Sequence, residues 1–149
     1  MADRAQDEHA RWLALKSLID SGLHHADLDA VLARIDEEPD GTVADGARGH
    51  LVKNGGLTDE DLRRLRSRPG FEVGPMRRIV DEACWLRDAE AAADETELRR
   101  VVATGIKSVQ QLVVHRDDLP RPVLEQLASD GATRAIRNVA RQRLNRRRP

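Results

Sequence analysis

Aliphatic side chains recur at intervals of three and four residues along most of this chain of 149 residues. From Leu28 to Ile35, for example, they occupy the first, fourth, fifth and eighth positions, which form one face of an α-helix. The helical period fits every segment, so the sequence predicts an all-α fold with no sheet. Nine helices are expected, at about residues 9–23, 27–35, 42–54, 58–69, 75–93, 94–105, 107–116, 120–129 and 133–148.

The predicted helices follow a repeated pattern. Four times, a stretch anchored by leucine or valine runs into a glycine and is followed by a second apolar stretch; the glycines are Gly41, Gly70, Gly105 and Gly131. Recurrence every ~26–36 residues is typical of stacked helical pairs, which bury their apolar faces against their neighbours. The sequence therefore predicts one domain over residues 1–149, a right-handed α-solenoid of about four and a half stacked helical hairpins.

Polar residues mark where several of the helices begin. Thr58 and Asp61 have the spacing of a capping box, Asp94 opens a similar sequence, and Thr42 is placed to cap the third helix. These signals fix the register of the helices and hence the residues that face inward. We expect one buried aliphatic side chain in each of four hairpins, at Leu62, Ile79, Leu112 and Leu127.

Composition limits the class of protein further. Aromatic residues make up only 2% of the chain, which is low for a β-rich fold. Cys84 is the one cysteine, so neither a disulfide within the chain nor a thiolate zinc site is available. No apolar run reaches the ~18 residues of a membrane span, and residues 1–11 are too polar for a signal peptide. We therefore expect a cytoplasmic protein that has no contact with a membrane.

A more specific pattern of short paired helices covers residues 98–144. Its segments are Val109–Val114, Leu119–Pro120, Val123–Asp130 and Ile136–Ala140. This pattern resembles the leucine-rich-repeat-variant family, a relative of HEAT-like repeats, in which a proline lies near the loop and an aspartate precedes the next helix. The resemblance implies a helical-repeat fold but no particular activity. Family members with an iron–sulfur cluster also carry a cysteine cluster, and this feature does not transfer to a chain with one cysteine.

The sequence contains no pattern that favours catalysis or a bound metal. His24 and His25 are adjacent, so on a helix they point about 100° apart, unlike the spaced ligand pair of a zinc enzyme. Residues 36–41 resemble the start of a calcium loop, but Ala47 occupies the twelfth position, where a bidentate glutamate is required. Phosphate-loop and nucleophile-elbow sequences are missing as well. We therefore expect no enzyme activity, no cofactor and no metal.

Two pairs of arginines occupy equivalent places in the repeat. Arg63–Arg64 and Arg99–Arg100 each follow the anchoring leucine of a second helix. Stacked repeats would align the pairs into a basic strip on the concave side, which predicts a binding surface for an acidic partner. The simpler interpretation, a solvated surface whose charge is balanced by neighbouring acids, stays open.

Positive charge is concentrated at the end of the chain. The net charge is −1, yet from Thr133 onward there are seven arginines and no acidic residue. Arg134, Arg137, Arg141 and Arg148 share one face of the last predicted helix and form a possible basic patch. Two alternatives stay open: a solubilising cap on the last repeat, or the background of a GC-rich coding genome, since only three of the 25 basic residues are lysine.

A helical repeat supplies a surface rather than chemistry. The sequence therefore predicts a non-enzymatic protein–protein interaction module, a scaffold or adaptor, whose concave face binds another protein with an acidic surface. The alternative is a HEAT-like protein that binds nucleic acid through its arginine-rich C-terminal half, and a HEAT-like DNA glycosylase is a more remote candidate. The scarcity of aromatic residues counts against single-stranded nucleic acid, which proteins bind by stacking.

Overall fold

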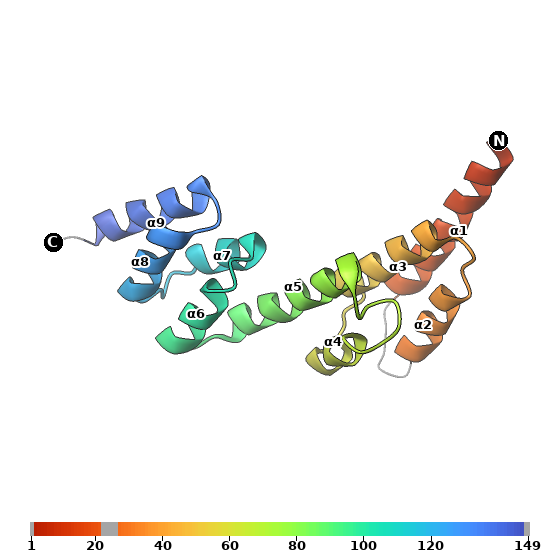
Figure 1. The fold of residues 1–149 in the computed structure, drawn as a ribbon, viewed down its shortest axis with the longest axis horizontal. Helices are drawn as coiled ribbons and strands as arrows, with labels where there is room; N and C mark the ends of the chain where they lie inside the picture. Colours follow the sequence, from red (N-terminus) through yellow and green to blue (C-terminus); the bar gives the residue numbers. More distant parts are fainter. Residues whose placement is uncertain (1, 22–26, 148–149) are drawn as a thin grey trace. The chain divides into compact units, whose positions relative to one another are not determined.

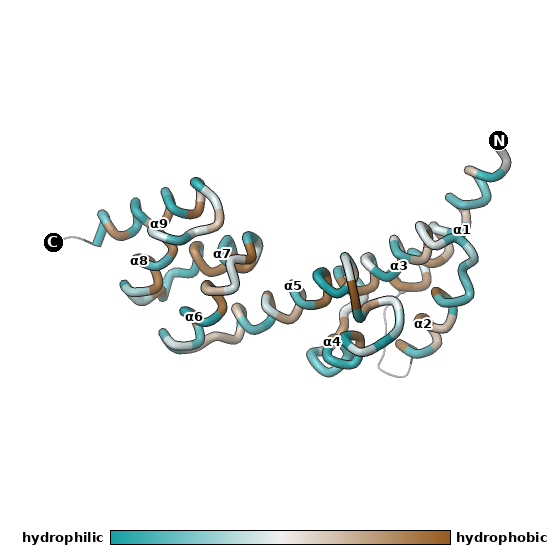
Figure 2. The backbone as a smooth tube through the Cα atoms, viewed as in Figure 1, coloured by the Kyte–Doolittle hydropathy of each residue, from teal (hydrophilic) through white to brown (hydrophobic). Residues whose placement is uncertain are grey.

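The computed structural model describes residues 2–21 and 27–147, and every regular element within them is an α-helix (Figure 1). The predicted all-α class is therefore confirmed for this part of the chain. The helices are α1 Ala2–Asp20, α2 Leu28–Asp36, α3 Gly41–Asn54, α4 Asp59–Leu65, α5 Gly74–Ala91, α6 Glu95–Val102, α7 Lys107–Val114, α8 Arg121–Asp130 and α9 Arg134–Arg146. Figure 2 shows hydrophilic and hydrophobic residues interleaved along helices such as α3, α7 and α9, as expected for amphipathic helices.

Some helix ends differ from the sequence prediction. Helix α1 begins at Ala2 rather than near residue 9, and the ion pairs Arg4–Glu8 and Asp7–Arg11 span its early turns at i,i+4 spacing. Apolar periodicity does not detect these turns because their side chains are polar and exposed. The expected end of this helix, near residue 23, lies outside the described residues.

The predicted caps at Thr58 and Asp94 are confirmed, and the cap at Thr42 is wrong. Thr58 Oγ1 accepts the Asp61 N–H at 3.2 Å, and Asp61 in return accepts the Thr58 N–H at 3.0 Å. Asp94 accepts the Glu97 N–H at 2.9 Å. Helix α3 begins at Gly41, earlier than a cap at Thr42 would allow, so Asp40 takes the capping position and accepts the N–H groups of residues 42 and 43 at 2.8 and 3.2 Å.

Contacts between Cα atoms divide the chain into two compact units. Unit 1 is Met1–Ala83 and unit 2 is Cys84–Pro149, so the boundary falls within α5. The sequence predicts one repeat domain over the whole chain, and that stays a prediction.

Unit 1 is built on contacts among its first three helices. Helix α1 packs against α2 and α3, and α2 packs against α3 (Figure 1). At the end of α1, Asp20 contacts Lys16 and, at 2.6 Å, His50 of α3. Hydrogen bonds from Lys16 and then His50 hold the pKa of Asp20 below its ordinary value. The fully buried large side chains of this unit are Ile19, Leu28, Leu32, Ile35, Leu51, Leu62, Leu65 and Phe71.

The loop between α4 and α5 carries part of the core of unit 1. Phe71 is fully buried although it belongs to a turn rather than a helix. Its neighbour Gly70 has φ +89°, and a Cβ there would lie 2.8 Å from Arg48 Nε. Arg48 in turn contacts Asp36 at 3.2 Å and Asp45 at 2.8 Å. The sequence marks Gly70 as a repeat signal, and the structure shows a local need for glycine.

The start of α5 is tied to the end of α4 by one carboxylate. Asp81 accepts hydrogen bonds from Arg66 at 2.7 Å and from Arg77 at 3.0 Å. Burial alone would raise the pKa of Asp81, but the hydrogen bonds and charges of the two guanidinium groups outweigh it and hold that pKa below its ordinary value.

The lowered pKa predicts a pH-dependent contribution to stability. Asp81 stabilises the fold at pH values above its ordinary pKa, and this contribution is lost as the pH falls through the lowered folded-state pKa. We therefore expect Asp81→Asn to destabilise the chain at neutral pH and to do so less at about pH 3. Urea unfolding of both proteins at the two pH values measures this, and an equal loss at both would contradict the assignment.

In unit 2, α6 and α7 each pack against the next helix and the next but one. Helix α6 contacts α7 and α8, α7 contacts α8 and α9, and α8 contacts α9 (Figure 1). Gly131 closes the turn after α8, and a Cβ there would lie 2.5 Å from the carbonyl oxygen of Leu127. The largest fully buried side chains of this core are Leu98, Leu119, Leu124 and Leu127.

A buried glutamine connects three parts of unit 2. The Gln110 side chain is only 2% exposed; its Nε2 donates to the Val102 carbonyl at 2.9 Å, and its Oε1 accepts the Ala132 N–H at 2.7 Å. It therefore links α7 to the end of α6 and to the turn before α9. The sequence does not mark Gln110 as buried, because a lone glutamine has no spacing pattern that distinguishes it from an exposed one.

Of the four aliphatic side chains that are expected to be buried, two are buried and two are not fully buried. Leu62 and Leu127 are buried as predicted, whereas Ile79 and Leu112 are only half-buried. In α7 the buried residues are Val109, Gln110, Val113 and Val114, so Leu112 falls at the edge of the buried face.

Candidate functional site: two arginine pairs

Helices α4 and α6 present arginines in the same register. In α4, Arg63 and Arg64 lie five and six residues after the capping Thr58. In α6, Arg99 and Arg100 lie five and six residues after the capping Asp94. All four arginines are exposed, and each pair occupies the last turn of its helix, where positive charge complements the helix dipole. The two arginine pairs are therefore equivalent in their distance from a helix cap and in their exposure, as well as in the sequence.

The arginine pair of unit 1 is only partly neutralised. Arg64 Nη2 lies 3.0 and 3.2 Å from the two carboxylate oxygens of Asp29 on α2. The side chains remain 51% and 65% exposed, so this ion pair is open to water. The Arg63 side chain is exposed and forms no hydrogen bond or ion pair with the described residues.

The arginine pair of unit 2 has two carboxylate neighbours and one aromatic neighbour. Arg99 Nη1 lies 3.7 Å from Glu95, and Arg100 Nη2 lies 3.5 Å from Asp88 of α5. The Arg100 guanidinium also lies 5.4 Å from the centre of the Trp85 ring, which is a cation–π contact. Both arginines remain more than half exposed.

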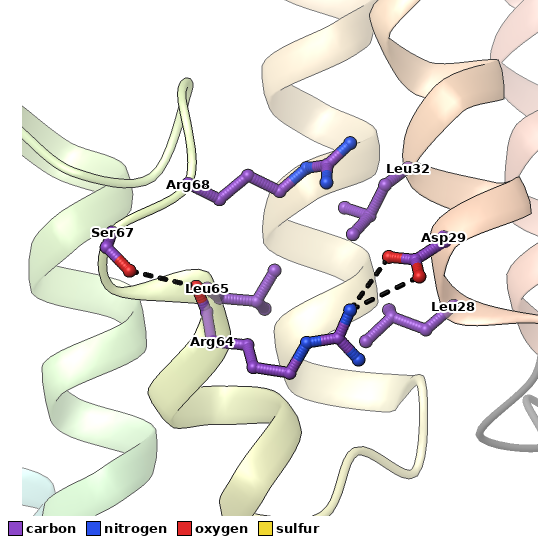
Figure 3. A pocket seen from close by; sticks show the side chains of 7 residues that line it. All are labelled: Leu28, Asp29, Leu32, Arg64, Leu65, Ser67 and Arg68. Atoms are coloured by element: carbon purple, nitrogen blue, oxygen red, sulfur yellow. Dashed lines mark hydrogen bonds and ion pairs between the residues drawn. The ribbon is translucent and has the colours of Figure 1, made fainter.

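A small hollow lies between α2 and α4 beside Arg64 (Figure 3). It encloses about 250 Å³ and has three leucines, three polar or charged donors and one carboxylate in its lining, namely Leu28, Leu32, Leu65, Arg64, Ser67, Arg68 and Asp29. Arg68 Nη2 contacts Asp36 at 3.2 Å, but the buried Nε–H group of Arg68 has no acceptor within the described structure. The hollow thus combines apolar side chains with hydrogen-bond donors, a combination that suits an acidic side chain of a partner.

The two arginine pairs belong to different units. Arg63 and Arg64 lie in unit 1, whereas Arg99 and Arg100 lie in unit 2. Their alignment into one strip therefore stays a prediction.

Only some arginines of the possible basic patch at the end of the chain are available to a partner. Arg134 and Arg141 are exposed on α9, whereas Arg137 donates to the Gly131 carbonyl at 2.6 Å and helps to hold the preceding turn. Arg148 lies outside the described residues. Arg143 and Arg147, which the predicted patch does not include, also bind backbone carbonyls. Arginine-to-carbonyl contacts have no signature in a single sequence, so this structural role was not foreseen.

Another arginine stabilises the end of α5. Arg116 Nη1 donates to the carbonyls of Ala89 and Ala92 at 3.0 and 2.8 Å, while Asp118 contacts the same guanidinium at 2.9 Å. This hydrogen bond with Arg116 lowers the pKa of Asp118. Arg116 is therefore structural rather than available to a partner.

The residues of the possible calcium loop have other partners, and the two adjacent histidines lie outside the described residues. Asp36 contacts Arg48 and Arg68, and Asp40 caps α3. His24 and His25 lie outside the described residues. Across residues 2–21 and 27–147, no group of three or more histidine, cysteine, aspartate or glutamate side chains is placed to hold a metal ion.

Comparison with known proteins adds no further constraint. No protein-family model, no curated protein and no solved structure matches this chain. Among the helices of the described ranges, none is both long enough and apolar enough to span a bilayer.

Proposed function

We propose that this chain is a non-enzymatic protein–protein interaction module that binds an acidic partner through Arg63, Arg64, Arg99 and Arg100. The observation that supports this proposal best is the matched presentation of the two pairs. Each pair lies at the same distance from a helix cap, in the last turn of its helix, and is exposed. Repetition of one feature at equivalent positions is how helical-repeat proteins build an extended binding surface.

We also propose that the fold is a helical repeat of the right-handed α-solenoid kind, similar to leucine-rich-repeat-variant and HEAT-like proteins. Unit 2 supports this, since its helices α6 and α7 each contact the next helix and the next but one. That is the contact pattern expected for one helical hairpin packed on another.

The ion pairs that these arginines already form are compatible with an acidic partner. Asp29, Glu95 and Asp88 form ion pairs with three of the four arginines, and all of these pairs are open to water. Exposed pairs of this kind contribute about 0–1 kcal/mol each. A partner carboxylate can therefore replace the internal one at little energetic cost, and the hollow beside Arg64 provides space for it.

The proposal is tested by reversing one charge in each pair. We expect Arg64→Glu with Arg100→Glu to weaken capture of the partner from the native host at least tenfold, because the charges at the surface change sign. The matched control is Arg34→Glu with Arg121→Glu, which alters one exposed, carboxylate-paired arginine in each unit. Quantitative mass spectrometry of the captured proteins measures both.

The helical signal and the melting temperature should remain nearly unchanged in both double variants, because surface pairs contribute little to stability. The proposal is supported if one captured protein is retained by the parent and by the control but is lost from Arg64→Glu with Arg100→Glu. Equal retention of every captured protein by all three forms would contradict it.

A further inference from the structure

The four arginines of the proposed binding surface differ in what holds their side chains. The Arg63 side chain forms no hydrogen bond or ion pair with the described residues, and Arg99 lies 3.7 Å from a carboxylate of its own helix. Arg64 lies closer to a carboxylate, at 3.0 and 3.2 Å from the two oxygens of Asp29. Among the described contacts of these four, Arg100 is the one with an aromatic partner.

That aromatic partner, Trp85, gives Arg100 a fixed support. The tryptophan is half-buried on α5 and packs against the buried core of unit 2. The Arg100 guanidinium lies over its ring, 5.4 Å from the ring centre, which is within the range of a cation–π contact. Both residues belong to unit 2, so the contact lies within one compact part of the chain.

The contact with the ring restrains Arg100 without neutralising it, because an aromatic ring carries no net charge. The carboxylate neighbour of Arg100, Asp88, lies 3.5 Å from Nη2, which is long for a charge-assisted hydrogen bond. The Arg100 side chain is still 60% exposed. A cation that is held in place and remains charged loses less conformational entropy when an anion binds.

We infer that Trp85 is a positioning residue that holds Arg100 for a carboxylate of the acidic partner, and that Arg100 contributes more to binding than the other three arginines. This inference rests on the proposed function. Arg64 has to release a closer carboxylate before it binds another, and Arg63 and Arg99 have no aromatic support among their described contacts. The planar fork of a supported guanidinium fits a carboxylate through two N–H groups.

The first test makes one substitution at two adjacent positions. Arg99→Lys and Arg100→Lys both keep the charge, but lysine lacks the planar fork that stacks on a ring and binds a carboxylate bidentately. The full chain is titrated into a fluorescein-labelled oligoglutamate peptide at about 20 mM salt, where exposed charges are weakly screened. Fluorescence anisotropy should show Arg100→Lys to weaken binding about two- to fivefold and Arg99→Lys by less than about 1.5-fold.

A double-mutant cycle separates positioning from a general effect on the fold. Trp85→Leu removes the ring and should weaken binding about two- to fivefold, whereas Trp85→Phe keeps a ring and should restore most of the affinity. In the Trp85→Leu background, Arg100→Lys should weaken binding by less than about 1.5-fold, because the contact is already lost. The matched control is Trp12→Leu, which should leave affinity unchanged because Trp12 packs against His50.

Tryptophan emission provides a measurement that does not depend on the folding of Trp85→Leu. In Trp12→Phe, Trp85 is the one tryptophan of the chain, and unlabelled peptide should change its emission with the midpoint of the anisotropy titration. Unchanged emission at saturating peptide would overturn the inference, as would equal weakening by the two lysine variants or a full effect of Arg100→Lys without the ring. These results would leave the proposed function intact, whereas failure of the parent chain to bind the peptide would overturn both.

Discussion

Replacing Phe71 by alanine is expected to lower the free energy of unfolding by about 3–5 kcal/mol, the usual effect of removing a buried aromatic side chain. Phe71 is fully buried, yet it lies in the turn between α4 and α5, so its ring fixes a loop as well as filling the core. A loss of this size is a large fraction of the about 5–15 kcal/mol that holds a typical domain folded. Chemical denaturation followed by circular dichroism measures it.

The same loop provides the control. Val73 is 74% exposed, and Val73→Ala should change stability by less than about 0.5 kcal/mol. Hydrogen exchange should also quicken in α2, α3 and α4 more than in α6 to α9, because the core of unit 2 contains no residue of this loop. Equal loss of stability in the two variants would show that the ring of Phe71 is not part of the core.

Replacing Gln110 by alanine is expected to destabilise unit 2 by about 2–4 kcal/mol, because a buried side chain and two hydrogen bonds are lost together. The Val102 carbonyl and the Ala132 N–H lose their partner, and α7 loses its link to the turn before α9. The effect should be seen as a lower melting temperature and faster exchange in α7 to α9.

The next residue along the chain is a matched control. Gln111 has the same side chain on the same helix but is exposed, so Gln111→Ala should change stability by no more than about 0.5 kcal/mol. If the two alanine variants melted at the same temperature, the hydrogen bonds of Gln110 would not contribute to the stability of the fold.

Local signals in the sequence predicted helix positions well. The capping box at Thr58 and the cap at Asp94 depend on atoms within four residues, so spacing alone reveals them. The prediction of Thr42 as a cap was wrong because Asp40 and Thr42 are both good capping residues two positions apart. The start of α1 was missed because its first turns carry charged and polar residues and no apolar period.

Contacts between distant residues could not be predicted in this way. Arg143 and Arg147 were interpreted as part of a basic end, yet they bind the carbonyls of Val114, at the end of α7, and of Leu119, just before α8, about 28 residues earlier along the chain. The four glycines of the repeat are a related case. Gly70 is required by its positive φ of +89° and Gly131 by a close contact with the Leu127 carbonyl, whereas a Cβ at Gly41 would meet no atom within 4 Å. A common spacing in the sequence therefore does not imply a common structural role.

The sequence predicted which arginines form the candidate binding surface, but not the carboxylates and the hollow that lie beside them. Repetition located Arg63–Arg64 and Arg99–Arg100, because the pairs follow equivalent leucines. The carboxylates that neutralise Arg64 and Arg100 come from other helices, α2 and α5, so no local pattern reveals them. The hollow between α2 and α4 depends in the same way on tertiary packing.

The binding role of the arginine pairs is tested most directly by hydrogen exchange of the full chain with and without its captured partner. The account predicts slower exchange in the last turns of α4 and α6, around residues 63–66 and 99–103, with little change in α9. Protection confined to α9 or to α1, with α4 and α6 unchanged, would contradict it.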